Sequence, residues 1–482
     1  TLWVGIADVA HYVRPGTTLD ASARNRATSV YLPHAVLPML PPKLADELCS
    51  LRAEVDRFSM VVAMHLNEAN EIESTEAYEA VINVKRNLAY EDALGKREFK
   101  PMFELAAAWQ EKEVRLNIQN AELRPRLHGD EAIRVDVKWP NEATRMIESF
   151  MVATNTSIGH YLGSIGAPLP WRCHTPPDAP EVEELNAKLD ALGVDIVLPR
   201  PSTRTHGQSE TTELSNLLGA WAGAGVDLSG LSEPEKEPSE EVDAYLANVL
   251  DPDARQSILD ALEHAQEKAS QLTGPIRRVV DQGLFQLMQR AKYSEENLGH
   301  FGLNLDAYVH FTSPIRRYPD LMAHRQLKAH LHGLAWVHDE EETATLAAHC
   351  SERGHSAKRL EWELVANAYH IHLLRGGAIG GQSNEEAAIE GETTYKARVT
   401  GLRGVWVFLD LADDGSVHGR MHVRQLGGKR RLLVDEFGLS VLPAEPDHNG
   451  EHPPVIQLGQ VFPCRLRGLD VWGGSLDLAP VN

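Results

Sequence analysis

Apolar side chains recur with helical spacing at several places in the first three quarters of the chain. Residues 142–163 illustrate the pattern, because their apolar positions fall three, four and seven residues apart. Such a stripe indicates one face of a helix packed against a core. Helices are predicted over 103–118, 142–163, 180–192, 242–270, 275–292, 318–333 and 340–375.

The start of the chain follows a different pattern. Residues Leu2 to Val13 read as a strand-like run, which a turn at Pro15-Gly16 ends. Strands and turns are expected to continue to about Met64. Strands followed by helices predict an α+β architecture for this part of the chain.

Period-two alternation returns after a polar linker at 378–387. Residues 392–411 read as a strand pair around Gly401–Gly404. Five short strands close together fit an OB-type β-barrel. We therefore expect two domains, at residues 1–380 and 388–482. The remaining predicted strands are 419–423, 462–466 and about 475–478.

Composition narrows the class of protein. The 482 residues include 43% apolar and 24% charged residues, as in ordinary soluble globular proteins. No apolar run approaches the length of a transmembrane helix, and the N-terminus lacks a signal-peptide pattern. The four cysteines are scattered and lack metal-ligand spacing, which indicates reduced thiols and a cytoplasmic location. A membrane partner is not expected.

The charge balance is acidic. The chain has 47 basic and 69 acidic residues, a net charge of −22, which argues against a surface broadly coated by nucleic acid. Part of the acidity lies in residues 230–241, which read as an exposed loop. An internal basic channel stays compatible with this charge. A nucleic acid would then be captured at a few focused sites, with strong salt dependence.

Residues 299–325 concentrate arginine, histidine and tyrosine around Ser313-Pro314. Pro314 pre-sets the first turn of a helix that begins close by, which would place Arg316 and Arg317 at its N-terminus. Basic side chains oppose the helix dipole there, so an anionic partner such as phosphate is indicated. A surface salt bridge at a helix start is an equally good local explanation.

The same segment, GHFGLxLxAYxHFTSPIRRYPDLxxHR, resembles the signature of the ribonuclease II / ribonuclease R (RNB) exoribonucleases. Further matches are IADVAHYV at 6–13, TSVYLP at 28–33 and LAYED at 88–92. The resemblance covers about residues 1–380. It implies an α+β catalytic domain, built as a mixed sheet with surrounding helices and followed by an S1-type barrel.

The resemblance also implies an activity. Members of this family degrade single-stranded RNA processively from the 3′ end, releasing nucleoside 5′-monophosphates with two Mg²⁺ ions. Arg316 matches the arginine that stabilises the transition state, and Arg317 would contact the RNA beside it. Tyr90 and Glu148 match residues at the terminal nucleotide. Tyr31 matches an RNA-contacting tyrosine and Glu361 a glutamate near the 3′ end.

Each of these positions has a structural alternative. Tyr31 could be a packed turn residue, Tyr90 could secure a helix start, and Glu361 could pair with an interior arginine. The family's aspartate motif is not found in the chain; we expect the metal ligands upstream of Thr1, with Asp8 near the metal site. A non-catalytic RNA-binding protein on the same domains is the alternative function.

The C-terminal strands resemble the S1 RNA-binding domain. Tyr395, Trp406 and His422 would lie on adjacent strands and stack on RNA bases, while residues 429–431 (Lys-Arg-Arg) would hold phosphates. The alternative is that Tyr395 and Trp406 are core residues. Single-stranded RNA is the expected partner, and a monomer is the expected state.

Overall fold

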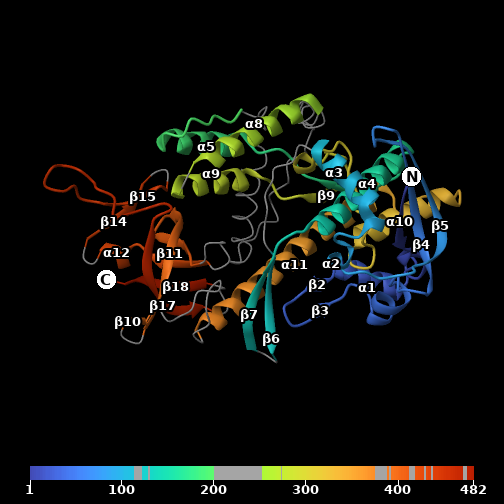
Figure 1. Cartoon of the computed structure of the whole chain (residues 1–482), viewed down its shortest axis with the longest axis horizontal. Helices are drawn as coiled ribbons and strands as arrows, with labels where there is room; N and C mark the ends of the chain where they lie inside the picture. Colours follow the sequence, from blue (N-terminus) through green and yellow to red (C-terminus); the bar gives the residue numbers. More distant parts are fainter. Residues whose placement is uncertain are drawn as a thin grey trace, which may run out of the picture.

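A computed structural model describes most of the chain (Figure 1). The predicted loop at 230–241, the linker at 378–387 and Lys429 lie outside the described residues. The helix-rich N-terminal part and the C-terminal barrel lie at opposite ends of the molecule. The described residues are 1–112, 122–128, 131–199, 252–272, 274–374, 388–389, 392–411, 418–427, 430–435, 438–470 and 475–481.

A three-stranded antiparallel sheet forms the centre of the N-terminal part, in the order β1 (Leu2–Ala7), β4 (Asp56–Leu66), β5 (Ile72–Asn83). Buried side chains of β4 pack with Ile158 and Leu162 of helix α4 (Glu142–Ser164). The first strand is shorter than predicted, because Asp8 accepts a hydrogen bond from the His11 N–H and starts a 3-10 turn. The α+β class is confirmed.

The predicted helices are confirmed where the structure describes them. Figure 1 shows α11 running from the N-terminal part toward the barrel. Their bounds are α3 (Lys100–Lys112), α4, α5 (Ala179–Ala191), α8 (Pro252–Gln271), α9 (Gly274–Leu287), α10 (Tyr318–Leu331) and α11 (Glu340–Leu374).

Among the described helices of more than two turns, α1 (Thr18–Arg26) was not predicted from the sequence. Thr17 caps it by accepting a hydrogen bond from the Asp20 N–H, and Ala27 ends it in the left-handed region at φ 57°. Only Asp20 and Ala23 are buried along the helix, so no apolar stripe marks it.

The remaining short elements connect these parts of the fold. They are β2 (Val30–Tyr31), β3 (Val36–Leu37), a π-helical turn (Lys43–Leu48), α2 (Tyr90–Ala93), β6 (Glu122–His128), β7 (Glu131–Lys138), β8 (Trp171–Cys173), β9 (Lys292–Ser294), β10 (Ala388–Ile389) and α12 (Arg424–Gly427).

The C-terminal strands form a closed five-strand barrel, as predicted for an OB-type fold. Pairing of the first strand with β17 closes the barrel, and Gly404, at φ 60°, turns the first hairpin. A small sheet of β14 (Leu432–Val434), β15 (Ser440–Pro443) and β16 (Ile456–Gln457) was not predicted. The barrel strands are β11 (Glu392–Arg403), β12 (Trp406–Asp410), β13 (His418–His422), β17 (Val461–Asp470) and β18 (Ser475–Pro480).

Candidate functional site

The arginine-rich segment forms a tight turn before α10. The N–H groups of Arg316 and Arg317 both donate to the Ser313 carbonyl, at 3.1 Å each. Pro319, rather than Pro314, occupies the first turn of the helix, which begins at Tyr318. Arg317 is therefore the N-cap residue in an extended conformation, and Arg316 lies before the helix.

Arg317 and Asp320 form a buried ion pair. The guanidinium of Arg317 donates two hydrogen bonds of 2.7 Å to the carboxylate of Asp320, which is fully buried. The same carboxylate accepts the N–H of Ser313 at 2.7 Å. The salt-bridge explanation thus applies to Arg317, in a buried form. This places Arg317 against Asp320 instead of free for the RNA contact that was predicted.

Arg316 has the opposite environment. Its side chain is exposed, and its guanidinium donates a weak hydrogen bond of 3.3 Å to the Ser313 hydroxyl. Its carbonyl accepts hydrogen bonds from the Ser29 N–H at 3.0 Å and the Thr28 hydroxyl at 3.2 Å. The backbone is therefore fixed while the guanidinium stays accessible.

The segment paired with this turn leads directly to Tyr31. The Tyr31 side chain is 48% exposed, so it is not a packed turn residue. Its N–H donates to the Glu361 carboxylate at 2.7 Å, and Glu361 also lies 3.6 Å from the Lys358 ammonium. The alternative that Glu361 pairs with an interior arginine is not what the structure shows, because its partners are the Tyr31 N–H and Lys358. The structure thus links three distant parts of the chain: Arg316 is hydrogen-bonded to Ser29, two residues before Tyr31, and Tyr31 is hydrogen-bonded to Glu361.

A buried polar layer supports the turn. Asn155 of α4 donates to the Tyr308 hydroxyl at 3.0 Å and accepts the Phe311 N–H at 2.9 Å. The His310 ring bonds the Tyr293 hydroxyl at 2.7 Å. Burial lowers the pKa of His310 well below its usual value, and nearby arginines add to the effect, so the ring is neutral.

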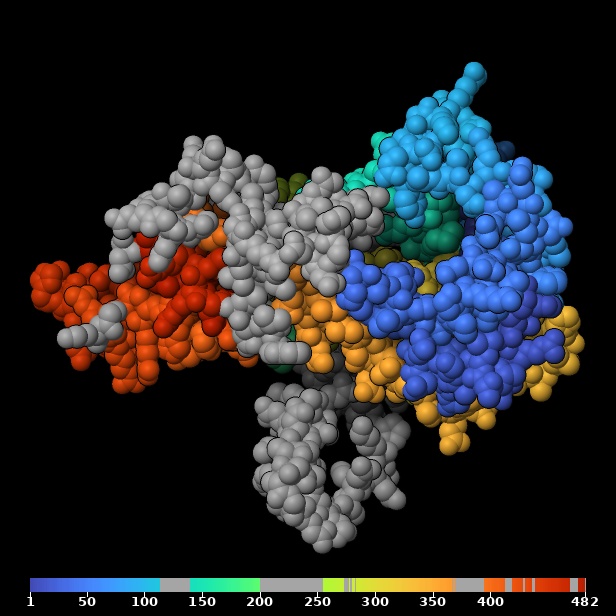
Figure 2. Space-filling view, turned by 90° about the horizontal axis from the view of Figure 1, so that it is seen from below, coloured from blue at the N-terminus to red at the C-terminus, as the bar shows by residue number. Residues whose placement is uncertain are grey.

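Tyr90 and Glu148 lie at a second position, nearer the N-terminus of α4 than Asn155. Helix α2 begins at Tyr90 and lies against α4, which presents Glu148 on its exposed side. The Tyr90 side chain is 44% exposed, which argues against a purely structural role. Asn155 follows Glu148 by seven residues, a rise of about 10 Å. Figure 2 shows this face of the molecule hollowed, with the green α4 recessed beside the light-blue segment.

Both carboxylate oxygens of Asp8 are occupied by contacts within the protein. It is buried and lies 2.5 Å from the Lys328 ammonium, in addition to capping the 3-10 turn. Among the described residues, no group of three or more histidine, cysteine, aspartate or glutamate side chains could hold a metal ion. These residues therefore do not fit a two-Mg²⁺ centre.

The barrel separates the predicted stacking residues. Tyr395 is only 7% exposed and belongs to the barrel core, so its predicted contact with RNA is wrong. Its inward-facing strand position explains the burial. Trp406 and His422 do face outward, directly opposite each other, with ring centroids 5.3 Å apart. Arg420 covers the Trp406 ring at 4.7 Å.

Alternation along the strands adds residues that the sequence analysis missed. Phe408 and His418 lie on the same outward surface as Trp406, because successive side chains of a strand alternate between faces. We call this surface, made by Trp406, Phe408, His418, Arg420 and His422, the outer barrel face. The spacing of two residues between the aromatic side chains at 406 and 408 could have indicated from the sequence that both lie on one strand face.

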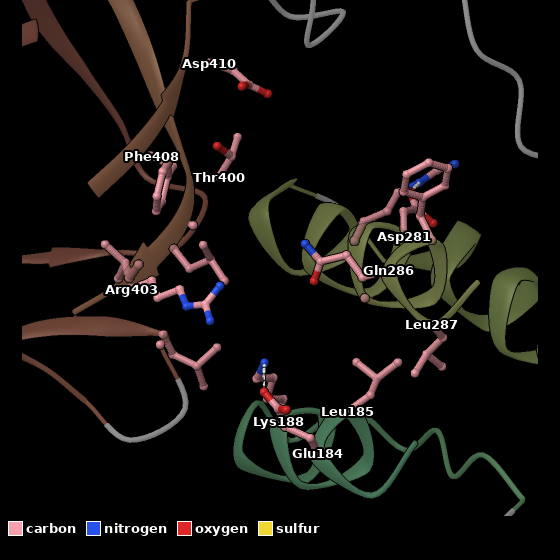
Figure 3. A pocket seen from close by; sticks show the side chains of 18 of the residues that line it. Glu184, Leu185, Lys188, Asp281, Gln286, Leu287, Thr400, Arg403, Phe408 and Asp410 are labelled. Atoms are coloured by element: carbon pink, nitrogen blue, oxygen red, sulfur yellow. Dashed lines mark hydrogen bonds and ion pairs between the residues drawn. The ribbon is translucent and has the colours of Figure 1, made fainter. Parts of the chain in front are cut away.

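Part of the outer barrel face lines a large cleft. The cleft has a volume of about 1900 Å³ and separates the barrel from α5 and α9. Figure 3 shows Arg403 and Phe408 on the barrel side, facing Lys188 and Asp281 on the helices. The exposed Trp362 of α11 also lines it.

Residues 1–333 match the RNB domain. The chain belongs to the RNB family. Ribonuclease R of Thermotoga maritima is 30% identical over 512 residues, covering 100% of this chain and 60% of that protein. Ribonuclease R of Aquifex aeolicus is 28% identical over 449 residues, covering 88% of this chain and 53% of its own length. This RNB chain thus spans less than two thirds of either relative.

Solved structures support the same fold. The apo form of Mycoplasma genitalium RNase R covers 99% of this chain and 66% of its own, with a TM-score of 0.71 at 20% identity. The structure of that protein with ribose-methylated single-stranded RNA gives the same values. Yeast Ssd1, described as a pseudonuclease, has a TM-score of 0.58 at 19% identity. None of the helices in the described part of the chain has the length and apolarity to cross a membrane.

Proposed function

We propose that this RNB protein is a processive, hydrolytic 3′→5′ exoribonuclease, which degrades single-stranded RNA to nucleoside 5′-monophosphates. The observation that carries the proposal is the exposed Arg316 guanidinium on a fixed turn, beside Tyr31 and Glu361. The names of the relatives and the RNB domain support the same activity.

Arg316 is suited to the charge that develops on a scissile phosphate. A guanidinium offers paired donors to phosphate oxygens, and a donor fixed in advance needs little reorganisation as charge develops. Glu361 holds the Tyr31 backbone, so it orients the tyrosine ring for a contact with RNA. The terminal nucleotide lies in this proposal against Tyr90, with Glu148 beside it.

The proposed reaction requires metal ions, but the described residues do not form a site for them. Phosphodiester hydrolysis of this type uses two divalent ions, held by carboxylates, to activate water and stabilise the leaving oxygen. The described residues supply no such group, so no step is assigned to Mg²⁺. For the complete gene product, we expect RNA cleavage to require Mg²⁺ and to stop in EDTA, while RNA binding persists.

A non-catalytic RNA-binding protein is the second candidate. One observation favours it: the described residues form no metal-binding group. The two candidates differ in whether RNA is shortened.

The division into domains at 1–380 and 388–482, the cytoplasmic location and the monomeric state stay predictions.

Digestion of 5′-labelled single-stranded RNA by the complete gene product, in the presence of Mg²⁺, tests the proposal. We expect stepwise shortening from the 3′ end and a rate about 100-fold lower for Arg316→Ala. Arg14→Ala, which removes an exposed arginine of the N-terminal part, is the matched control and should leave the rate unchanged. Binding without shortening by the unaltered protein would favour the second candidate instead.

A further inference from the structure

The outer barrel face continues onto α11. Three cross-strand pairs follow one another along β12 and β13, namely Trp406 with His422, Phe408 with Arg420, and Asp410 with His418. The His418 ring lies 6.1 Å from the ring of Trp362, at an interplanar angle of 31°. A hydrogen bond of 2.6 Å to Asp410 holds His418 in place. Aromatic surface therefore runs from Trp406 to Trp362.

Trp362 is the neighbour of Glu361 in the chain. Successive residues of a helix point about 100° apart, so α11 can present Glu361 to Tyr31 and Trp362 to the barrel. Trp362 is 54% exposed, although it is a large apolar side chain. The helix thus joins the outer barrel face to the site that contains Arg316.

The walls of the cleft differ in chemistry. The barrel wall carries Arg403 and the 41% exposed Phe408, together with Asp435 and with Asp410, which is hydrogen-bonded to His418. The helical wall carries more acids than bases, because Glu184 pairs with Lys188 and Asp281 with Arg277 while further acids remain. These further acids are Glu181, Glu263 and Glu267. Phosphates are repelled by uncompensated carboxylates and attracted by arginine, so a nucleic-acid strand is directed to the barrel wall (Figure 3).

We propose that Trp362 is a base-stacking residue, at which single-stranded RNA passes from the outer barrel face to the Tyr31–Arg316–Glu361 site. The inference rests on the proposed function and adds a binding position to it. Indole presents the largest aromatic face among side chains, and stacking accepts every base. Trp362 is therefore expected to hold RNA without sequence preference.

The test compares RNA of two lengths bound by the full chain in EDTA. A 5′-fluorescein oligouridylate of about 4 nucleotides fills the Arg316 site alone, and one of about 16 nucleotides also reaches the barrel. Fluorescence anisotropy should show that Trp362→Ala weakens binding of the long RNA about tenfold and leaves the short RNA unchanged. Trp362→Phe should retain most of the affinity.

Trp139→Ala is the matched control, because Trp139 is 53% exposed and should not affect either length. Thermal unfolding of each variant checks that the fold is intact. Equal affinity of Trp362→Ala and unaltered protein for the long RNA would overturn the inference alone. Equal weakening of both lengths would also overturn it, since Trp362 would then act through Glu361. Absence of RNA binding by the unaltered protein would overturn the proposed function as well.

Discussion

Asp320 shows how a single buried carboxylate organises the arginine turn. It receives hydrogen bonds from the Ser313 N–H and from the Arg317 guanidinium, and it has no exposed surface. Its removal would leave a buried guanidinium without its counter-charge. Asp320 is therefore a positioning residue for Arg316, because it acts through Ser313 and Arg317.

We expect Asp320→Asn to lower the free energy of unfolding by about 3 kcal/mol, because it breaks a buried ion pair. Urea denaturation measures this change. The control is Asp306→Asn, which breaks a largely exposed pair with His160 at 3.3 Å and should cost less than about 1 kcal/mol. Equal effects of the two variants would contradict the role given to Asp320.

Individual residues were the hardest scale to predict. Arg316 and Tyr31 could be selected from the sequence. The different roles of Arg316 and Arg317 could not, since an anionic partner and a salt bridge are equally good local explanations for both arginines. That division depends on Asp320, whose burial arises from tertiary packing. Tyr395 failed for a related reason, because only the barrel decides which strand face points inward.

At the scale of elements, α1 and α10 are joined by a buried cluster. Arg325 donates to Asp20 at 2.6 Å and to the Val13 carbonyl at 2.8 Å, and the Tyr318 hydroxyl donates to Asp20 at 2.9 Å. Burial alone would raise the pKa of Asp20, but these donors outweigh burial and lower it. The carboxylate is thus stabilised in its charged form.

This shift predicts a pH dependence of stability. A lowered folded-state pKa contributes stability above the unfolded value of about 3.9, and the contribution is lost as pH falls through the folded value. We expect unaltered protein to exceed Asp20→Asn in unfolding free energy at pH 7, and the difference to shrink below about pH 4. Chemical denaturation at several pH values measures both. A pH-independent difference would contradict the assignment to Asp20.

Two glycines provide a matched pair of substitutions. A Cβ on Gly302 would lie 2.6 Å from the Nδ1 of the buried His174, so Gly302→Ala should destabilise the protein by about 1–3 kcal/mol. A Cβ on Gly354 in α11 meets nothing within 4 Å, so Gly354→Ala should stabilise it by about 0.5–1 kcal/mol. Thermal unfolding should move in opposite directions, and a shift in the same direction would contradict the packing at Gly302.

Long elements were predictable because their patterns are local. The helices α4 and α11 and the five barrel strands follow from periodicity. By contrast, α1 depends on a cap and a buried polar cluster, which periodicity does not record. The small sheet of β14–β16 was missed because its strands have only two to four residues.

At the scale of the whole molecule, the net charge of −22 confines RNA capture to a few cations. Arg316, Arg403 and Arg420 are the arginines along the proposed path. For single strands, each phosphate contact contributes about −0.7 to the slope of log affinity against log salt, so a slope near −2 is expected. Binding titrations in increasing KCl measure it. A slope steeper than about −5 would indicate a broad cationic surface instead.

The RNB fold and the C-terminal barrel were predictable, since the resemblance to RNB proteins indicated the first and the alternating C-terminal strands the second. The cleft between the barrel and α5 and α9 was not, because it depends on how distant elements pack.

Because Glu361 and Trp362 are neighbours in α11, both of their contacts depend on the number of residues that precede them in this helix. Arg24 binds Glu342 at 3.3 Å near the start of this helix, while Glu361 binds Tyr31 farther along. One residue inserted between 342 and 361 would turn both Glu361 and Trp362 by about 100° and advance them by about 1.5 Å. A point mutation removes one contact, whereas such an insertion would detach the site and the barrel contact together. Insertions after Trp362 would spare Tyr31.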